Sequence, residues 1–476
     1  MFKTPDELHA WVKDNLGLDV PRESVCGHHS APFDYLQHAY FEPTNDCVVW
    51  APRGGGKTRL GAVATLLDLM HKPGVSIRIM GGSLEQSMKM WEHLLPDVQK
   101  QFPDLKLRDG CKKISLPEGG TAAVLPQSQR AVRGMRVQKL RCDEVELFKP
   151  PVWEAAQLTT RSDAGRRKKA EGVSGVVEAF STLHESGGLM SQIVKHAEER
   201  GVPVFRWCIL DVLAECPPER KCEGCELWKE CQGRAKNDCH GFVSIEDAVR
   251  LKSRVSRETW ETEMLCLRPS VHGRVFPHFV EEVHVRDEVE TLLPVEDRGH
   301  PGVLSLAVDF GFANPFACLW VRRYGQGREA ITHVIDEHIE KEMTIDQHLA
   351  IIQARNWPQA GSIYCDPAGT HPNDQTATTN VKLLGDAGYK VKTRATPIAE
   401  GIELMRLAIA PALGEPRLFV HSRCRKLIDA LKSYKYPEPP KGESPLKDGT
   451  HDHPVDALRY YFVNHKPRGR VRGMMY

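Results

Sequence analysis

The sequence predicts two consecutive α/β domains joined by a small cysteine-rich segment. A glycine-rich loop connects an apolar run to a helical pattern near residue 50, and short apolar strands ending in aspartate recur from residue 303. Six of the fourteen cysteines lie between Cys208 and Cys239. These observations divide the chain into an N-terminal segment (1–45), a first α/β domain (46–207), a cysteine-rich linker subdomain (208–298), a second α/β domain (299–465) and a basic tail (466–476).

The composition is that of an ordinary globular protein. The chain of 476 residues is 41% hydrophobic and 27% charged, with a net charge of +1. A balance this close to neutral means that any binding to nucleic acid has to use a local basic surface, such as the tail beginning at Lys466. No apolar run approaches the roughly 20 residues of a membrane span, and the charged N-terminus gives no sign of a signal peptide. We therefore expect no membrane association.

The loop near residue 50 has the pattern of a Walker A phosphate loop. The apolar run Cys47–Trp50 leads into Arg53-Gly54-Gly55-Gly56-Lys57-Thr58, and a helical pattern follows. The glycines let successive backbone N–H groups face phosphate oxygens. Lys57 is expected to reach the terminal phosphates of ATP and Thr58 to place its hydroxyl on Mg²⁺. The strict pattern has glycine at position 51, where this chain has Ala51.

A second motif downstream completes the nucleotide site. The run Lys139-Leu140-Arg141-Cys142-Asp143-Glu144 resembles a Walker B strand, although Lys139 and Arg141 make it less apolar than usual. We expect Asp143 to hold Mg²⁺ and Glu144 to polarise the attacking water. The alternation of strands and helices predicts a P-loop ATPase domain of the ASCE type with a mostly parallel sheet. The strand end Ser181-Thr182 is either a γ-phosphate sensor or a simple turn.

The cysteine-rich segment has the spacing of a metal site. Its pattern is Cys216-x5-Cys222-x2-Cys225-x5-Cys231, and four thiolates this close together can close a tetrahedral site. Zn²⁺ is the leading choice and a 4Fe–4S cluster the alternative. Since the segment has few apolar residues, we expect the metal to have a structural role. Cys26, His28 and His29 lie in a turn-rich stretch far upstream.

The second domain follows the strand order of an RNase H-like fold. The strand 304–308 ends at Asp309, two further strands and a helix follow, and the strand near residue 363 ends at Asp366. A late helix begins near Pro454 and carries Asp456, with Asp452 just before it. In this topology the first strand, the fourth strand and the last helix bring their carboxylates together.

Those carboxylates suit two-metal catalysis. Two divalent ions about 4 Å apart can activate water and stabilise the leaving oxygen of a phosphodiester. Asp309 is the expected bridging ligand, Asp366 the second ligand, and Asp456 or Asp452 the third, with Mg²⁺ or Mn²⁺ as the metal.

Taken together, these motifs resemble the large terminase subunit of tailed bacteriophages over nearly the whole chain. The residues that carry the resemblance are the phosphate loop, Arg133-Gly134 leading to Asp143-Glu144, Ser181-Thr182, Val308-Asp309-Phe310-Gly311, Cys365-Asp366-Pro367 and 452–458. The resemblance implies a motor that uses ATP to pump double-stranded DNA into a prohead and a nuclease that cuts concatemeric DNA. It also implies that Arg53 acts as an arginine finger. The cysteine-rich segment is not part of the family pattern.

The resemblance further implies the surroundings in which the protein acts. The expected partners are double-stranded DNA, the portal protein, the small terminase subunit and further copies of the chain in a ring on the portal. The expected location is the host cell cytoplasm, with transient docking on the prohead.

Two other functions fit parts of the sequence. A cellular ATP-dependent DNA helicase–nuclease would need a second motor domain after Ser181-Thr182, where the chain instead continues into the cysteine cluster. A non-catalytic zinc-dependent scaffold would not need Lys57, Thr58, Asp143 and Glu144 together with the aspartate set.

Overall fold

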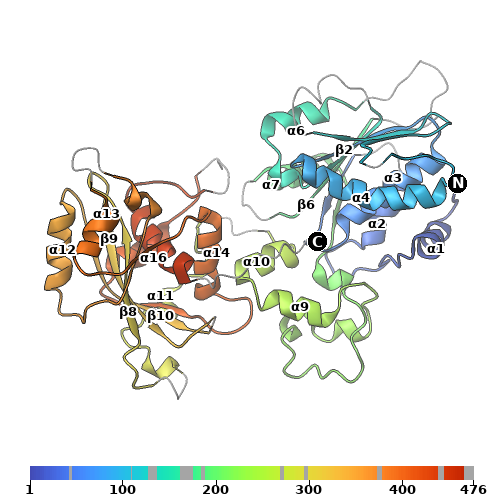
Figure 1. Ribbon diagram of the computed structural model, residues 1–476. Helices are drawn as coiled ribbons and strands as arrows, with labels where there is room; N and C mark the ends of the chain where they lie inside the picture. Colours follow the sequence, from blue (N-terminus) through green and yellow to red (C-terminus); the bar gives the residue numbers. More distant parts are fainter. Residues whose placement is uncertain are drawn as a thin grey trace. The chain divides into compact units, whose positions relative to one another are not determined.

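The computed structural model contains two compact units (Figure 1). Unit 1 comprises residues 1–251 and 259–269, and unit 2 comprises residues 252–258 and 270–476. The residues 273–293, which the sequence analysis assigned to the linker, belong to unit 2 in this division. The structure describes residues 1–41, 46–108, 110–126, 137–160, 175–183, 188–268, 273–293, 298–327, 329–372, 378–437 and 444–465.

Unit 1 is built on a seven-stranded sheet in the order β3-β4-β2-β5-β6-β1-β7. All neighbouring pairs are parallel except β3 and β4, which form the antiparallel hairpin at the edge. The strand β6 lies between β1, which leads into the phosphate loop, and β5, which ends at Asp143. This inserted strand is the arrangement expected of an ASCE-type ATPase. The strands are β1 (Cys47–Trp50), β2 (Ser76–Gly81), β3 (Lys113–Ser115), β4 (Thr121–Leu125), β5 (Lys139–Asp143), β6 (Val176–Ser181) and β7 (Val204–Arg206).

Helices cover this sheet because their apolar faces have the helical period. The helices α2, α3 and α4 pack in sequence, with α4 against β2, while α7 packs against β1 and β7 (Figure 1). Shorter turns follow β7, including η2 (Ile209–Val212), α8 (Trp228–Cys231) and η3 (Arg234–Lys236). The main helices are α1 (Pro5–Leu16), α2 (Pro32–Phe41), α3 (Lys57–His71), α4 (Leu84–Gln101), α6 (Pro150–Gln157), α7 (Leu189–Arg200) and α9 (Ile245–Lys252).

Unit 2 has a six-stranded sheet in the order β12-β11-β8-β9-β10-β13. The central strands β8, β9 and β10 are antiparallel, whereas β11 pairs with β8 in parallel. The predicted RNase H-like order of three antiparallel strands, a helix, a fourth strand and a late helix is confirmed. The strands are β8 (Val303–Asp309), β9 (Phe316–Tyr324), β10 (Ile331–Glu340), β11 (Ile363–Cys365), β12 (Val391–Thr393) and β13 (Leu418–Val420).

Apolar side chains cover both faces of this sheet. One core includes Leu319 and Tyr461, and a second core includes Trp320 and Leu349. The late helix α16 packs against β8, β9 and β11, so it lies over the sheet centre. The helices of this unit are α11 (Glu281–His284), α12 (Ile345–Ala354), α13 (Asn380–Asp386), α14 (Ile398–Ile409), α15 (Arg425–Ser433) and α16 (Asp452–His465).

No helix among the described residues is long and apolar enough to cross a membrane.

Candidate functional site: a phosphate loop and an aspartate cluster

The phosphate loop has the backbone conformation that its glycines allow. Gly54 and Gly56 have φ values of 72° and 84°, in the left-handed region that favours glycine. A Cβ added to Gly55 would lie 2.6 Å from two ring carbons of Pro52, so this position also excludes a side chain. Ala51 is fully buried and its φ is not positive, which explains why alanine is accepted there. The loop ends at the N-terminus of α3, where backbone N–H groups are available to an anion.

The side chains that follow the glycines contact the predicted Walker B pair. The Thr58 hydroxyl donates a hydrogen bond to Asp143 Oδ2 over 2.9 Å. The Lys57 ammonium lies 3.0 Å from Glu144 Oε1. Lys57 and Asp143 are both buried, and burial together with the Glu144 charge raises the pKa of Asp143 to about 6. The two motifs, 85 residues apart in the sequence, therefore form one site.

Glu144 lies at a turn in the backbone. Its φ is 52°, an uncommon value for a residue with a side chain, and it begins the short turn η1 (Val145–Leu147) directly after β5. Its own N–H donates to Asp143 Oδ1 over 3.1 Å. A strained conformation of this kind is frequent at functional sites.

The basic residues of the β5 strand are buried ion-pair partners. Arg141 donates to both carboxylate oxygens of Glu178 over 2.9 Å and to Asp68 Oδ2 over 2.7 Å. Lys139 lies 3.0 Å from Asp68 Oδ2. Because side chains alternate along a strand, Lys139, Arg141 and Asp143 share one face of β5. The polar character of this strand thus comes from a buried network behind the nucleotide site.

Two further predicted residues lie beside the loop. The carbonyl of Ser181, at the end of β6, accepts a hydrogen bond from the Ala51 N–H over 3.2 Å. The Ser181 hydroxyl accepts from the Glu146 N–H over 3.3 Å. The Arg53 guanidinium is paired with Glu263, and its side chain is 68% exposed. Arg53 is therefore on the outside of the loop.

In unit 2, two predicted aspartates lie at the same edge of the sheet. Val308 and Cys365 are partners in the parallel pair of β8 and β11, so Asp309 and Asp366 follow at neighbouring strand ends. Asp309 is buried, and burial together with the charges of Asp456 and Asp366 raises its pKa to about 6, despite the opposing effect of His453. Asp366 accepts a hydrogen bond from the Ala368 N–H over 2.9 Å.

The first turns of α16 bring the remaining predicted aspartates to β8. Asp452 and Asp456 are both buried on this helix. Asp456 is paired with Arg459 over 2.9 Å and with Lys447, and the Lys447 ammonium also lies 3.9 Å from Asp452 Oδ2. His453 Nδ1 lies 2.7 Å from Asp309 Oδ2. From the sequence, His453, like His451, was expected to be either an outer ligand or simply exposed, whereas Lys447 carries no motif that marks it as a site residue.

These residues fit a divalent cation. Asp452 Oδ1 is buried and has no hydrogen-bond partner, which leaves one carboxylate oxygen available as a ligand. The ammonium of Lys447 already balances the negative charge of two carboxylates, those of Asp452 and Asp456, as a bound cation would. Carboxylate oxygens are the ligands that Mg²⁺ and Mn²⁺ prefer.

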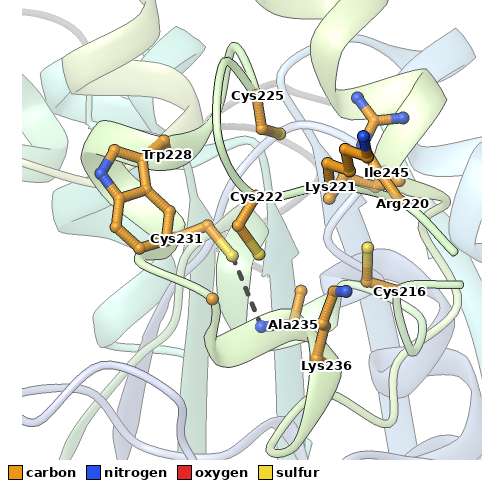
Figure 2. Close-up of a pocket in the computed structure, with 11 residues that line it drawn as sticks. Cys216, Arg220, Lys221, Cys222, Cys225, Trp228, Cys231, Ala235, Lys236 and Ile245 are labelled. Carbon is orange, nitrogen blue, oxygen red and sulfur yellow. Dashed lines mark hydrogen bonds between the residues drawn. The ribbon is translucent and has the colours of Figure 1, made fainter. Parts of the chain in front are cut away.

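The four predicted zinc cysteines line one pocket. Cys216, Cys222, Cys225 and Cys231 surround it together with Arg220 (Figure 2). These four sulfurs are not close enough to one another to form a compact group of possible metal ligands. Among the described residues, a different set of side chains forms such a group. That group consists of Cys26, His29, Cys208 and Asp211, which the sequence analysis did not connect.

Some predicted features lie outside the described residues. These are Arg133-Gly134 and the basic tail at 466–476.

Comparison with known proteins agrees with this geometry. Residues 306–465 match the family model of the terminase RNaseH-like domain. The chain is also similar to the large terminase of the thermophilic bacteriophage D6E, with a TM-score of 0.50 and 13% identity over 90% of this chain and 97% of that one. The nuclease domain of the P22 large terminase is 20% identical over 40% of this chain and 92% of its own, with a TM-score of 0.32. None of the curated proteins compared with the chain matches it.

The family match covers the aspartate cluster, and the fold of the D6E protein extends over both units. The second unit is an RNase H-like domain. A helicase–nuclease would instead need a second motor domain at this place in the chain. Residues 306–465 thus form a terminase RNaseH-like domain, and with the P-loop sheet in front of that domain the chain has the fold of the D6E large terminase.

Proposed function

We propose that this chain is the motor and endonuclease of viral DNA packaging. It would hydrolyse ATP to move double-stranded DNA into a prohead, and its second domain would cut concatemeric DNA. The observation that carries the motor function is the pairing of Thr58 with Asp143 and of Lys57 with Glu144. Phosphate binding, metal binding and activation of water each have a candidate residue within this one group.

In the ATPase site, each residue has a distinct role. The N–H groups of Gly54 to Thr58 and the N-terminus of α3 would bind the phosphates, and Lys57 would exchange its pairing with Glu144 for the terminal phosphates. Mg²⁺ bound near Thr58 and Asp143 would supply positive charge to the phosphate oxygens. Once released from Lys57, Glu144 would accept a proton from the attacking water.

Arg53 and Ser181-Thr182 have supporting roles in this proposal. Arg53 would leave Glu263 and turn to the phosphates as an arginine finger. The carbonyl of Ser181 is hydrogen-bonded to the loop at Ala51, so a change in the loop reaches the end of β6 directly. Ser181-Thr182 would pass the nucleotide state on to the DNA-moving part of the protein.

In the nuclease site, Asp309 would bridge two divalent ions, with Asp366 and one aspartate of α16 as further ligands. Asp452 has the unpartnered oxygen, whereas both oxygens of Asp456 are paired with cationic side chains. The bound ions, Mg²⁺ or Mn²⁺, would supply Lewis acidity and a metal-bound water. His453 would orient Asp309 through the hydrogen bond to its carboxylate.

We also propose that Cys216, Cys222, Cys225 and Cys231 hold a structural metal ion. Four thiols around one small pocket are the ligand set of a zinc site, with a 4Fe–4S cluster as the alternative. The partners we propose are double-stranded DNA, the portal protein, the small terminase subunit and further copies of this chain in a ring, all in the host cell cytoplasm.

The ATPase proposal is tested by steady-state hydrolysis with Lys57→Ala and Glu144→Gln proteins. We expect each substitution to lower kcat by roughly 100-fold or more, because each removes a charge placed for the transition state. Lys195→Ala and Glu199→Gln are matched controls on the exposed face of α7 and should retain the wild-type rate. Hydrolysis that survives both site substitutions would refute the motor function.

The nuclease proposal is tested by plasmid cleavage with Mg²⁺ or Mn²⁺. We expect Asp309→Asn to abolish metal-dependent cutting, since it removes the bridging charge. Asp346→Asn, in the exposed first turn of α12, is the matched control and should cut like the wild type. Equal cutting by the Asp309→Asn protein would mean that the aspartate set is not the catalytic centre.

A further inference from the structure

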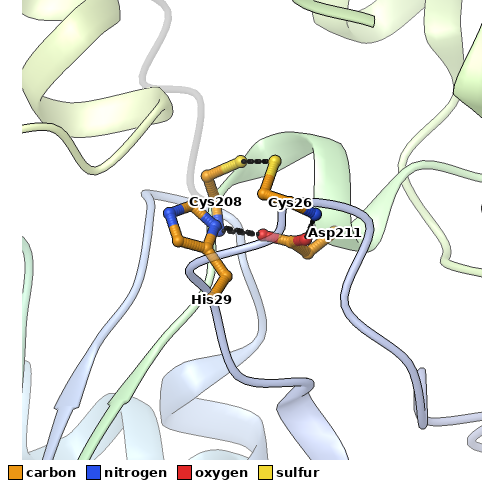
Figure 3. Close-up of side chains that lie close together, drawn as sticks. All are labelled: Cys26, His29, Cys208 and Asp211. Atoms are coloured by element: carbon orange, nitrogen blue, oxygen red, sulfur yellow. Dashed lines mark hydrogen bonds and ion pairs between the residues drawn. The ribbon is translucent and has the colours of Figure 1, made fainter.

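Four side chains from two distant segments of unit 1 meet near the phosphate loop. Cys26 and His29 lie in the turn between α1 and α2, and Cys208 and Asp211 lie at η2, just after β7 (Figure 3). One ligand atom from each of the four lies within 4.8 Å of all the others. Among the residues that the structure describes, no other group of three or more cysteine, histidine and acidic side chains is spaced this closely.

The two sulfurs have the separation of zinc ligands. Cys26 Sγ and Cys208 Sγ are 3.7 Å apart. Two thiolates on one tetrahedral zinc ion, each at about 2.3 Å from the metal, are about 3.8 Å apart. A disulfide would need a separation of about 2 Å, and both cysteines are free.

The other two ligands complete a set that zinc prefers. His29 Nδ1 lies 2.6 Å from Asp211 Oδ2, a hydrogen-bonding distance. Two thiols, one imidazole and one carboxylate together supply sulfur, nitrogen and oxygen donors of the kinds found in protein zinc sites. Figure 3 shows the two sulfurs side by side above the imidazole and the carboxylate.

The backbone around the group holds it in place. Asp211 Oδ1 accepts hydrogen bonds from the N–H groups of Val25 and Cys26 over 2.8 Å and 2.9 Å, and Asp211 Oδ2 accepts one from the Cys208 N–H over 2.7 Å. The Arg234 guanidinium donates to the Val25 carbonyl over 2.8 Å. Such outer hydrogen bonds orient ligands before a metal binds. Cys208 and Asp211 are almost fully buried, so the group is protected from solvent on that side.

We propose that Cys26, His29, Cys208 and Asp211 bind one zinc ion, at a site separate from the four-cysteine pocket. On binding, the two thiols lose their protons to solvent, His29 binds as a neutral imidazole through one ring nitrogen, and no oxidation or reduction takes place. The ion joins the segment before α2 to the end of β7. Its role is structural, because four protein ligands leave no open position for a substrate.

This site also reaches the nucleotide loop. Trp207 precedes Cys208, and its indole N–H donates to the Gly55 carbonyl over 2.8 Å. The metal would therefore fix the strand end that supports the middle glycine of the phosphate loop. Loss of the metal should loosen the loop without removing any residue that touches ATP.

The test is the zinc content of the purified full-length protein, measured by elemental analysis. We expect Cys26→Ser to contain one zinc ion fewer per chain than the wild type. Cys222→Ser/Cys225→Ser serves as the comparison, because it acts only on the four-cysteine pocket, and adding Cys26→Ser to it should remove a further zinc ion. Cys111→Ser, which changes a half-buried cysteine outside both groups, should leave the zinc content unchanged. A Cys26→Ser protein with the zinc content of the wild type would overturn the proposal.

A second measurement covers the case in which Cys26→Ser does not fold, as judged by circular dichroism. Cobalt is loaded into the Cys222→Ser/Cys225→Ser protein, which keeps the new site intact. We expect the intense visible bands of tetrahedral Co²⁺ and a sulfur-to-cobalt charge-transfer band, and their absence would refute the site. Because neither readout depends on ATP hydrolysis or DNA cleavage, the result stands apart from that of the proposed motor and nuclease activities.

Discussion

Gly55 is the residue of the phosphate loop whose side-chain position is already filled. A Cβ would lie 2.6 Å from Pro52, and the carbonyl of the same residue accepts the Trp207 indole N–H. We predict that Gly55→Ala moves the loop and weakens ATP binding by about 10-fold or more. The measurement is the Kd of a fluorescent ATP analogue. Gly361→Ala is the matched control, because a Cβ there meets nothing within 4 Å and should not change the Kd.

Lys447 is a cation that already lies among the aspartates of the nuclease site. It pairs with Asp456 and Asp452, the same carboxylates that are candidate metal ligands. Since two cations compete for these oxygens, we predict that Lys447→Gln tightens Mn²⁺ binding several-fold, as measured by isothermal titration calorimetry. Lys432→Gln removes an exposed pairing with Glu281 and should leave Mn²⁺ affinity unchanged. Unchanged or weaker binding by the Lys447→Gln protein would mean that Lys447 does not compete with the metal.

At the scale of elements, β5 is held to α3 and β6 by charge as well as by apolar packing. Arg141 on β5 is fully buried and binds Asp68 of α3 and Glu178 of β6. Lys139, Lys72 and Arg141 hold the pKa of Asp68 below its ordinary range, and Arg141 and Lys139 do the same for Glu178, although burial by itself would raise both pKa values. The network thus fixes the strand that presents Asp143 to the nucleotide site.

We predict that Arg141→Leu destabilises unit 1 by about 3–5 kcal/mol, because the buried Glu178 loses its main partner and the buried Asp68 loses one of its three cationic partners. The measurement is the urea midpoint of unfolding of the full chain. Lys195→Ala breaks an exposed pair on α7 whose side chains are 71% and 56% exposed, and it should cost about 1 kcal/mol or less. Similar midpoints for the two variants would contradict a stabilising role for the buried network.

At the scale of whole units, unit 2 contains histidines that are neutral when folded. Burial lowers the pKa of His333, His348 and His465 to about 4. In the unfolded chain these groups have pKa values near the ordinary value of about 6.5. The unfolded state therefore binds more protons between about pH 6.5 and 4, so the stability of the unit falls as the pH is lowered through that window.

We predict that His333→Gln makes this loss of stability shallower, because glutamine can still donate to the Arg286 carbonyl but does not titrate. The measurement is pulse proteolysis of the full chain over a series of urea concentrations, at about pH 7.5 and about pH 5. Peptides from β10 report the urea midpoint of unfolding of unit 2. His300→Asn changes an exposed histidine and should show the pH dependence of the wild type. A His333→Gln protein that loses as much stability as the wild type would assign the acid sensitivity to other groups.

Much of the fold and of the two expected sites was predictable from local sequence signals. Glycines at 54–56 followed by Lys57-Thr58 indicate a phosphate loop, since only this residue pattern combines positive φ values with a helix start and a phosphate ligand. The strand order of unit 2 follows from apolar runs that end in Asp309 and Asp366. The sequence also shows the spacing of the four cysteines, which line one pocket but whose sulfurs do not form a group within 4.8 Å of one another.

The sequence by itself determined the two α/β folds and the phosphate loop and predicted which aspartates form the nuclease site, because each of these signals consists of residues close together in the chain. Only the tertiary structure decided which distant charges meet. The ion pairs of Lys139 and Arg141 and the contacts of Lys447 and His453 join segments with no common motif. The same holds for Cys26 and Cys208, whose sulfurs lie 3.7 Å apart across 182 residues. Such pairs are set by packing of the sheet and its helices, and packing brings together residues whose spacing in the sequence carries no signal.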